Sequence, residues 1–437
     1  MNQTHESGLV RGIRRWDLVA VAINGIIGAG IFGLPSKVFK ETGAYSLIAF
    51  VACAMVVSLI VLCFAEVGSR TSETGGPYLY AREAFGPAVG FEVGWLMWIA
   101  RLTAFAANCN LFVTYLSFFL PAASQTLWRA IIIITVVLTL TVVNVIGVRD
   151  AAIASNIFTI GKLFPIILFI AVGLFFINPA NFSFDSPPSY GAFSSSVLSL
   201  IYAFTGFEMA VIPAGEVRDP RRNLPMAILT AMAIVALVYI LIQIVCIGTL
   251  ADLATSERPL SDAFGSFSGA KGAAIISAGA LISITGNLIV LILAASRLPF
   301  AMAERGELPS ALAATHKRFR TPAIAILVTA SVMLALTLSS GFVYALTISA
   351  IARLLAYSAT CAALPVLRAK KDAPAAMFKA PAGVAVSILS LALAIWLLSN
   401  TSLQEALDSA IAAVAGLAIY LYRYLYLVVA SNKRPQN

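Results

Sequence analysis

Long runs of apolar residues, separated by short polar segments, make up most of the chain. Several runs exceed the roughly 20 apolar residues that a helix needs to cross the hydrocarbon core of a membrane. The pattern therefore predicts an all-α membrane protein. We expect twelve transmembrane helices near residues 17–40, 44–67, 88–119, 127–147, 152–177, 193–215, 225–250, 271–301, 323–340, 342–366, 382–399 and 405–428.

Two of these runs are interrupted near their middles by glycine. Residues 24–35 read N-G-I-I-G-A-G-I-F-G-L-P, and residues 202–208 read Y-A-F-T-G-F-E. Inside a bilayer, non-helical backbone is tolerated only where protein or a cavity supplies hydrogen-bond partners. A pair of interrupted helices in the two halves of a chain indicates a transporter's substrate site. We therefore expect both helices to unwind at these points.

Each interrupted run begins a set of five predicted spans. Because five is odd, two such sets in tandem have opposite orientations in the membrane, which makes an inverted repeat. The last two helices are expected at the periphery. The predicted organisation is a cytoplasmic tail (1–16), a first five-helix repeat (17–178), a second, inverted repeat (192–368), helices 11 and 12 (380–428) and a cytoplasmic tail (429–437). We expect the polar segments 178–192 and 251–270 outside the cell, and a short surface helix within 302–321.

The charges agree with this topology. Apolar residues make up 60% of the 437 residues and charged residues only 11%, against about a quarter in soluble proteins. Most of the 29 Lys and Arg residues fall in alternate loops, and by the positive-inside rule these loops and both termini are cytoplasmic. The expected location is the cell (inner) membrane. Because the basic residues form no single stripe, the net charge of +9 does not indicate nucleic-acid binding.

No arrangement of residues predicts an enzyme, a metal site or a cofactor. The two histidines lie in a polar tail and a basic loop, and residues 28–33 match the dinucleotide fingerprint G-x-G-x-x-G without a preceding strand. The cysteines fall inside predicted spans without metal-ligand spacing, which is typical of packing residues. They are Cys53, Cys63, Cys109, Cys246 and Cys361.

The two interruptions supply complementary groups for a zwitterion. A helix that starts at the first break presents free N–H groups, so a carboxylate is expected on Gly28, Ala29 and Gly30. The carbonyl groups that end the preceding half-helices can accept from an ammonium group. Candidates for those carbonyls are Ile26, Tyr202 and Thr205. The combination fits an α-amino acid.

Ionisable residues inside a bilayer are functional by default. Lys162 lies ten residues into the fifth predicted span. Burial disfavours its charged form, so it can exchange protons near neutral pH. Alternatively, its fixed charge braces the broken first helix. Both roles stay open.

Five other charged residues within the predicted spans have expected roles. Glu208 either hydrogen-bonds the exposed amides of the second break or takes part in proton coupling or cation sensing. We expect structural pairing for Arg101 and Arg353, because arginine stays protonated. Glu66 and Glu92 are explained by interfacial placement at span ends.

Four stretches together resemble the amino acid–polyamine–organocation (APC) superfamily. They are the first break with its flanking glycines, residues 73–78 (E-T-G-G-P-Y), residues 204–225, which include F-T-G-F-E and E-V-R-D-P-R-R-N-L-P, and residues 296–309, which include S-R and M-A-E-R-G-E-L-P. The resemblance runs from Arg14 to about Arg368 and is weakest over the last two spans. It implies the leucine-transporter-like fold, a 5+5 inverted repeat plus two peripheral helices, and amino acids or related amines as substrates.

The resemblance also implies roles for individual residues. The family's carboxylate-binding loop falls on Gly28, Ala29 and Gly30, and Ala29 replaces the serine of arginine–agmatine exchangers. Their aromatic gate falls on Tyr202 and their side-chain pocket near Phe105 and Asn108. Lys162 resembles the lysine that takes the place of a sodium ion in proton-coupled bacterial amino acid transporters. Sodium dependence is therefore not expected.

We expect a secondary active transporter of amino acids that works by alternating access with proton-coupled symport, the proton gradient being its driving force. An amino acid/amine exchanger and an amino-acid-sensing membrane receptor are the alternatives; short tails argue against the receptor. The partners are a small amino acid, with a neutral side chain slightly favoured, and the lipid bilayer, for a monomer or homodimer. The expected substrate ligands are Ile26, Ile27, Gly28, Ala29, Gly30, Phe105, Asn108, Tyr202, Phe204, Thr205 and Phe207; Lys162 and Glu208 are the candidates for proton coupling.

Overall fold

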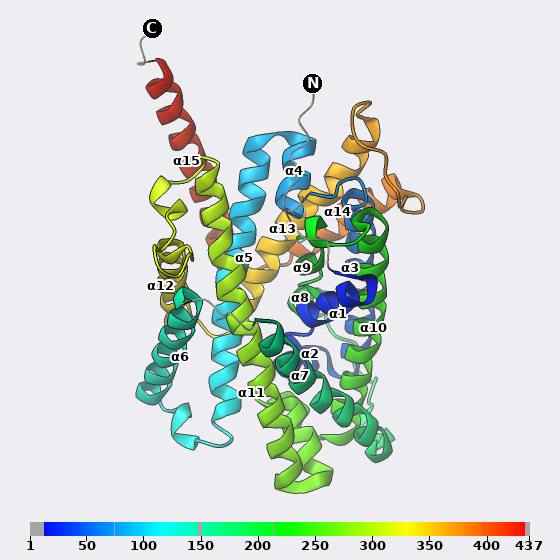
Figure 1. Ribbon diagram of the computed structural model, residues 1–437. Coiled ribbons are helices and arrows are strands. Elements are labelled where there is room, and N and C mark those ends of the chain that lie inside the picture. The colour runs from blue at the N-terminus through cyan, green and yellow to red at the C-terminus, as the bar shows by residue number, and fades with distance from the viewer. Residues whose placement is uncertain (1–12, 74, 147–150, 213, 433–437) are drawn as a thin grey trace.

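A computed structural model describes residues 13–73, 75–146, 151–212 and 214–432 as a bundle of helices (Figure 1). Within these residues β pairing is limited to one isolated bridge between Ile13 and Val217. Eight helices of the described part are long and apolar enough to cross a membrane. Because lipid offers no partners for backbone polar groups, helices are the expected result of such a sequence.

Helices occupy every range in which the apolar pattern predicts a span. The first half of the chain contains α1 (Arg15–Ile26), α2 (Gly30–Thr42), α3 (Ser46–Gly68), α4 (Pro77–Phe85), α5 (Pro87–Leu116), α6 (Thr126–Ile146) and α7 (Ala151–Gly173). The second half contains α8 (Tyr190–Phe204), α9 (Glu208–Val211), α10 (Pro220–Thr249), α11 (Pro259–Glu304), α12 (Ala323–Ser339), α13 (Phe342–Ala369), α14 (Gly383–Leu398) and α15 (Leu403–Asn432). The first predicted span is divided into α1 and α2, and the sixth into α8 and α9. Both predicted interruptions are confirmed.

Local sequence explains where several helices begin. Proline occupies the first position of α4, α5, α10 and α11, where its missing N–H costs no hydrogen bond. Asp17 accepts from the backbone N–H of Arg14 at 3.0 Å and caps the start of α1. These helices thus begin with residues that either have no backbone N–H, as proline does, or provide an acceptor for a free N–H at the helix start.

One connecting segment differs from expectation. The polar segment 251–270 is largely helical, because α11 begins at Pro259 and continues through a kink at Gly269, whose φ is 72°. Only glycine adopts that backbone angle readily, so the kink permits one long helix where we expected a loop and a span. The segment 302–321 contains the end of α11 and a short 3₁₀ helix, Ser310–Ala313, none of whose residues is buried, in agreement with the expected short surface helix.

The broken helices lie at the centre of the bundle (Figure 1). α1 packs against α10 and α9, α8 packs against α2 and α3, and α5 packs against α13 and α11. Large apolar side chains of α6, α12, α14 and α15 are exposed, among them Leu138, Leu327, Ile395 and Leu421. Exposed apolar faces on outer helices fit a lipid surround.

Candidate substrate site

The two breaks meet through glycine. A Cβ atom on Gly25 would lie 2.5 Å from the carbonyl oxygen of Gly206, and the backbone of Gly206 in turn abuts Gly25. Gly206 has a φ of 111°, a conformation that only glycine adopts without strain. The half-helices can therefore cross at backbone contact only because neither residue has a side chain.

The first break exposes backbone donors. Among the described residues, no acceptor binds the N–H groups of Gly28, Ala29 and Gly30, while Ile27 N–H still closes the last turn of α1 on Ile23. These three groups precede α2, whose N-terminus carries the positive end of a helix dipole. Gly30 also lies against Ala203, whose Cα would be 3.0 Å from an added Cβ. Free N–H groups beside a helix start form an anion-binding site.

A cavity of about 630 Å³ lies between the breaks. Nine of the expected site residues line it: Ile26, Gly28, Ala29, Gly30, Asn108, Lys162, Tyr202, Thr205 and Glu208. Its other polar lining includes Asn24, Arg101, Asn144, Asn287, Arg297 and Arg353. The volume is within the range of small-molecule sites.

Four of the expected ligands do not line the cavity. The Phe204 ring packs against Phe50 and Tyr239, and the Phe207 ring against Phe64 and Tyr357. Phe105 is fully buried, and the carbonyl oxygen of Ile27 accepts a hydrogen bond from Lys162. The aromatic residues beside the second break thus pack the surrounding helices together.

Tyr202 reaches from α8 across the cavity to α5. Its hydroxyl donates to Oδ1 of Asn108 and lies 3.3 Å from the carbonyl oxygen of Ala104. The ring is 8% exposed. The phenol group therefore links α8 to α5 beside the cavity, and the expected role of Tyr202 as an aromatic gate stays a prediction.

Lys162 holds the end of α1. Its ammonium group donates to the carbonyl oxygen of Asn24 at 2.9 Å, to Oδ1 of Asn24 at 2.6 Å and to the carbonyl oxygen of Ile27 at 2.7 Å. An ammonium has three donors and no acceptor, so all of its protons are used. These are the contacts that a bracing cation would make at the broken helix.

Glu208 is the acid of the second break. Its Oε1 pairs with Arg353 Nη1 at 2.5 Å, and its Oε2 accepts from Tyr357 Oη at 2.6 Å and from the N–H of Gly206 at 2.9 Å. The predicted hydrogen bond to an amide of the break is confirmed, and so is the predicted pairing of Arg353. The carboxylate joins the break to α13.

Sequence reasoning missed Tyr239 of α10. Its hydroxyl lies 3.1 Å from the carbonyl oxygens of both Ile26 and Ala203, at the ends of α1 and α8. Tyr202 O also accepts from Thr205 Oγ1 at 2.8 Å. A carbonyl oxygen has two lone pairs, so these acceptors retain capacity for an ammonium. The signal that could have identified Tyr239 is a hydroxyl-bearing side chain in the middle of a largely apolar span.

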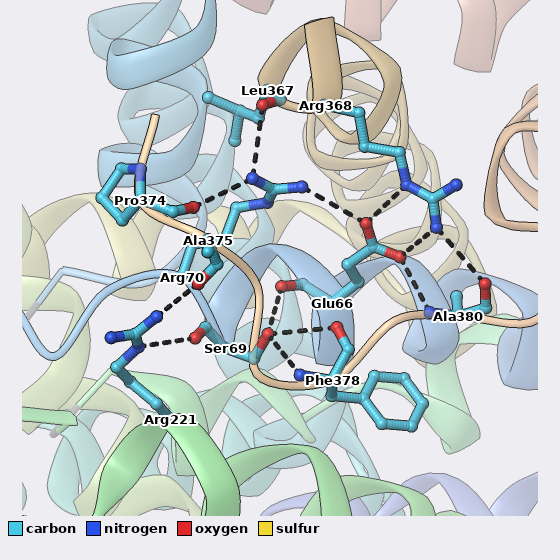
Figure 2. Close-up of polar contacts among 10 residues, drawn as sticks. All are labelled: Glu66, Ser69, Arg70, Arg221, Leu367, Arg368, Pro374, Ala375, Phe378 and Ala380. Carbon is cyan, nitrogen blue, oxygen red and sulfur yellow. Dashed lines mark hydrogen bonds and ion pairs between the residues drawn. The ribbon is translucent and has the colours of Figure 1, made fainter. Parts of the chain in front are cut away.

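Glu66 and Glu92 are more enclosed than a position at a span end requires. Glu66 is fully buried and pairs with Arg368, which donates to Oε1 and Oε2 at 2.7 Å each (Figure 2). Its Oε2 also accepts from the N–H of Ala380 at 2.8 Å, and Arg70 lies 3.4 Å from Oε1. Both carboxylate oxygens of Glu92 are buried with no partner among the described residues. Neither acid lines the cavity.

Comparison with known proteins places this geometry in a family. The pattern of the amino acid permease family matches residues 13–422. The chain is 28% identical to a methylthioribose transporter of Bacillus subtilis (strain 168), covering 90% of this chain and 89% of the relative. It is 30% identical to the serine/threonine exchanger SteT of the same organism, covering 95% and 96%. It is 27% identical to an arginine/agmatine antiporter of Chlamydia pneumoniae, covering 92% and 88%.

These relatives are transporters of the APC type, and the match spans nearly the whole chain. The expected family is confirmed by this match, and it agrees with the apolar helices and the two interruptions. The chain belongs to the amino acid permease family.

Proposed function

We propose that this protein is a secondary active transporter that moves amino acids by alternating access. The observation that carries the proposal is the cavity between the two broken helices, which is lined both by residues with free N–H groups and by residues at the carbonyl ends of α1 and α8. A carboxylate on Gly28–Gly30 and an ammonium near Ile26 and Tyr202 would use both sets of groups. The serine/threonine exchanger and the arginine/agmatine antiporter among the relatives support amino acid substrates.

The proposed layout is a 5+5 inverted repeat with two additional helices, both termini cytoplasmic, in the inner membrane. The matching positions of the two breaks support the repeat, and the basic loops support the orientation. The cavity extends to Asn144 of α6 and Arg297 of α11. Because these residues lie at predicted cytoplasmic span ends, the conformation is proposed to be inward-facing.

Proton-coupled symport is the proposed mode. Lys162 makes every one of its hydrogen bonds to the end of α1, so loss of its proton would free that half-helix to move. Release of the bound substrate and of a proton to the cytoplasm would then be linked. No sodium ion, metal or cofactor enters this mechanism.

The experiment is uptake into liposomes with and without an imposed pH gradient. We expect Lys162→Ala to lose gradient-driven accumulation and to keep part of its counterflow exchange, because exchange needs no net proton movement. Lys271→Ala, an exposed lysine elsewhere on the chain, is the matched control. Normal accumulation by the Lys162 variant would refute the coupling role.

An amino acid exchanger without net proton movement is the second candidate, favoured by the exchangers among the relatives. Counterflow that is insensitive to a pH gradient in the unmodified protein would select it. Binding of amino acids without any counterflow would instead select the receptor.

A further inference from the structure

One guanidinium on the cavity wall makes no hydrogen bond or ion pair within the described part of the chain. Arg101 of α5 is 3% exposed and lines the cavity. It makes no hydrogen bond or ion pair with a described residue, whereas Arg353 is paired with Glu208. Arginine stays protonated at any physiological pH. Arg101 is therefore a buried positive charge without a direct partner in the described part of the chain, and it borders the space between the breaks.

The charge around the cavity is strongly one-sided. Its described lining contains the basic residues Arg101, Lys162, Arg297 and Arg353, and Glu208 is its acid. Both oxygens of Glu208 are already bound by Arg353, Tyr357 and the amide of Gly206. A cationic side chain entering this cavity would meet repulsion without a free acid to bind.

The other bases are engaged by the protein itself. The ammonium group of Lys162 makes its three hydrogen bonds to the end of α1. Arg297 is partly exposed at the cavity's end and donates to Ser296 Oγ at 2.9 Å and to the Leu293 carbonyl at 3.3 Å. Arg353 is also deeply buried and its Nε has no partner in the described part of the chain, but its charge is paired with Glu208. Of the basic residues in the described lining, Arg101 alone is deeply buried without an ion pair, and a buried charge without a partner is strongly unfavourable.

α5 presents Arg101 together with two neutral positions. Ala104 and Asn108 also line the cavity, and spacings of three and four residues place all three on one face of a helix. The small side chain of Ala104 leaves space between the guanidinium and the Asn108 amide. This face of α5 and the free N–H groups of the first break border the same cavity.

We infer that the transported amino acid carries a second anionic group, such as the carboxylate of an acidic side chain, and that Arg101 binds it. The inference rests on the proposed transport function and deepens it. The free amides of Gly28–Gly30 and the carbonyls of the breaks would take the α-carboxylate and the ammonium, which cancel each other. The guanidinium then requires one further negative charge, and its planar donors match a carboxylate in two hydrogen bonds.

The first test is competition in liposomes that contain the unmodified protein. Counterflow of a radiolabelled amino acid mixture is measured against L-glutamate, L-aspartate, their amides L-glutamine and L-asparagine, and L-arginine. We expect each acid to compete at least about tenfold better than its amide, because hydrogen bonds to charged groups are strong, and arginine to compete least. Amides that compete as well as the acids would overturn the inference while leaving amino acid transport intact. No counterflow with any amino acid would instead refute the proposed function.

The second test compares Arg101→Gln, Arg101→Lys and Arg297→Gln by the ratio of acid to amide competition. Arg101→Gln should lose the preference for the acid by about tenfold. Arg101→Lys should retain part of it, because the charge remains but the two-pronged geometry is lost. Arg297→Gln should leave the ratio unchanged.

Two outcomes of the second test contradict direct recognition. An equal loss for acid and amide in Arg101→Gln would show that Arg101 only balances Glu208 and holds the helices. The same loss of ratio in Arg297→Gln would show that the preference reflects the general positive charge of the cavity. If Arg101→Gln fails to fold, the competition measured on the unmodified protein still decides.

Discussion

At the scale of single residues, the two glycines at the crossing determine whether the site can form. The contact between Gly25 and Gly206 leaves no room for a Cβ atom, and the φ of 111° at Gly206 excludes ordinary side chains. Both constraints come from the approach of one broken helix to the other. A mutation at either glycine therefore acts on the pair.

We expect Gly206→Ala to lower the thermal stability of the purified protein clearly and to abolish transport, with a cost of about 1–3 kcal/mol from backbone strain alone. Gly191→Ala is the matched control, because Gly191 lies near the start of α8 and an added Cβ would contact nothing within 4 Å. Its melting temperature should be unchanged or slightly raised, since alanine favours the helix. A Gly206 variant as stable as the control would show that the crossing is loose.

The residue scale also marks the limit of sequence reasoning at the site. The free amides at Gly28–Gly30 and the hydrogen bond from the N–H of Gly206 to the Glu208 carboxylate both follow from where a helix stops. Local sequence was therefore sufficient to predict them. The roles of Phe204 and Phe207 depend on whether a ring points to the cavity or to Phe50 and Phe64. Rotation of a half-helix decides that direction, and no local pattern encodes it.

At the scale of elements, a buried polar cluster fixes the end of α3 to distant parts of the chain (Figure 2). Glu66 binds Arg368 of α13 and the amide of Ala380, while Arg221 of α10 donates to the carbonyl of Ser69 at 3.0 Å. Ser69 Oγ lies within hydrogen-bonding distance of the Phe378 backbone. The cluster holds α3, α10 and α13 together through the segment that follows α13.

We expect Glu66→Gln to lower the melting temperature, because breaking a buried, hydrogen-bonded pair leaves cations without their counter-charge; the loss should be on the order of 2–4 kcal/mol, reduced by the partial exposure of Arg368. Glu92→Gln makes the same chemical change at an acid whose oxygens have no partner among the described residues, so it should not reduce stability. Thermal unfolding of both variants in the same detergent measures the difference. Equal losses would mean that the cluster contributes nothing specific.

The elements were the most predictable level of the structure. Apolar runs of membrane length allow only helices, and each predicted range contains one. The extension of α11 into the segment 259–268 was missed because that segment mixes serine, glycine and phenylalanine and reads as a loop. The burial of Glu66 was missed because its partner Arg368 is about 300 residues away in the sequence.

At the scale of the whole molecule, the cavity has more exposed residues on one side of the first break than on the other. Val21 of α1 lines it and is 37% exposed. On the other side of the first break, Phe32 is fully buried and its carbonyl oxygen accepts from Tyr115 at 2.7 Å, while Ser36 is 6% exposed. Alternating access requires that this difference between the two ends be reversed during transport.

Single cysteines at the two ends can report that reversal, because the five native cysteines are buried. We expect Val21→Cys to react with a membrane-impermeant maleimide added from the cytoplasmic side of oriented vesicles, and Ser36→Cys to react with none from either side in the resting protein. Under counterflow with a mixture of the twenty amino acids, Val21→Cys should react more slowly and Ser36→Cys should become reactive from the outside. Reaction of Val21→Cys from the outside would reverse the proposed orientation. Rates that do not change during counterflow would mean that substrate passes without the two ends exchanging access, which is incompatible with alternating access by these helices.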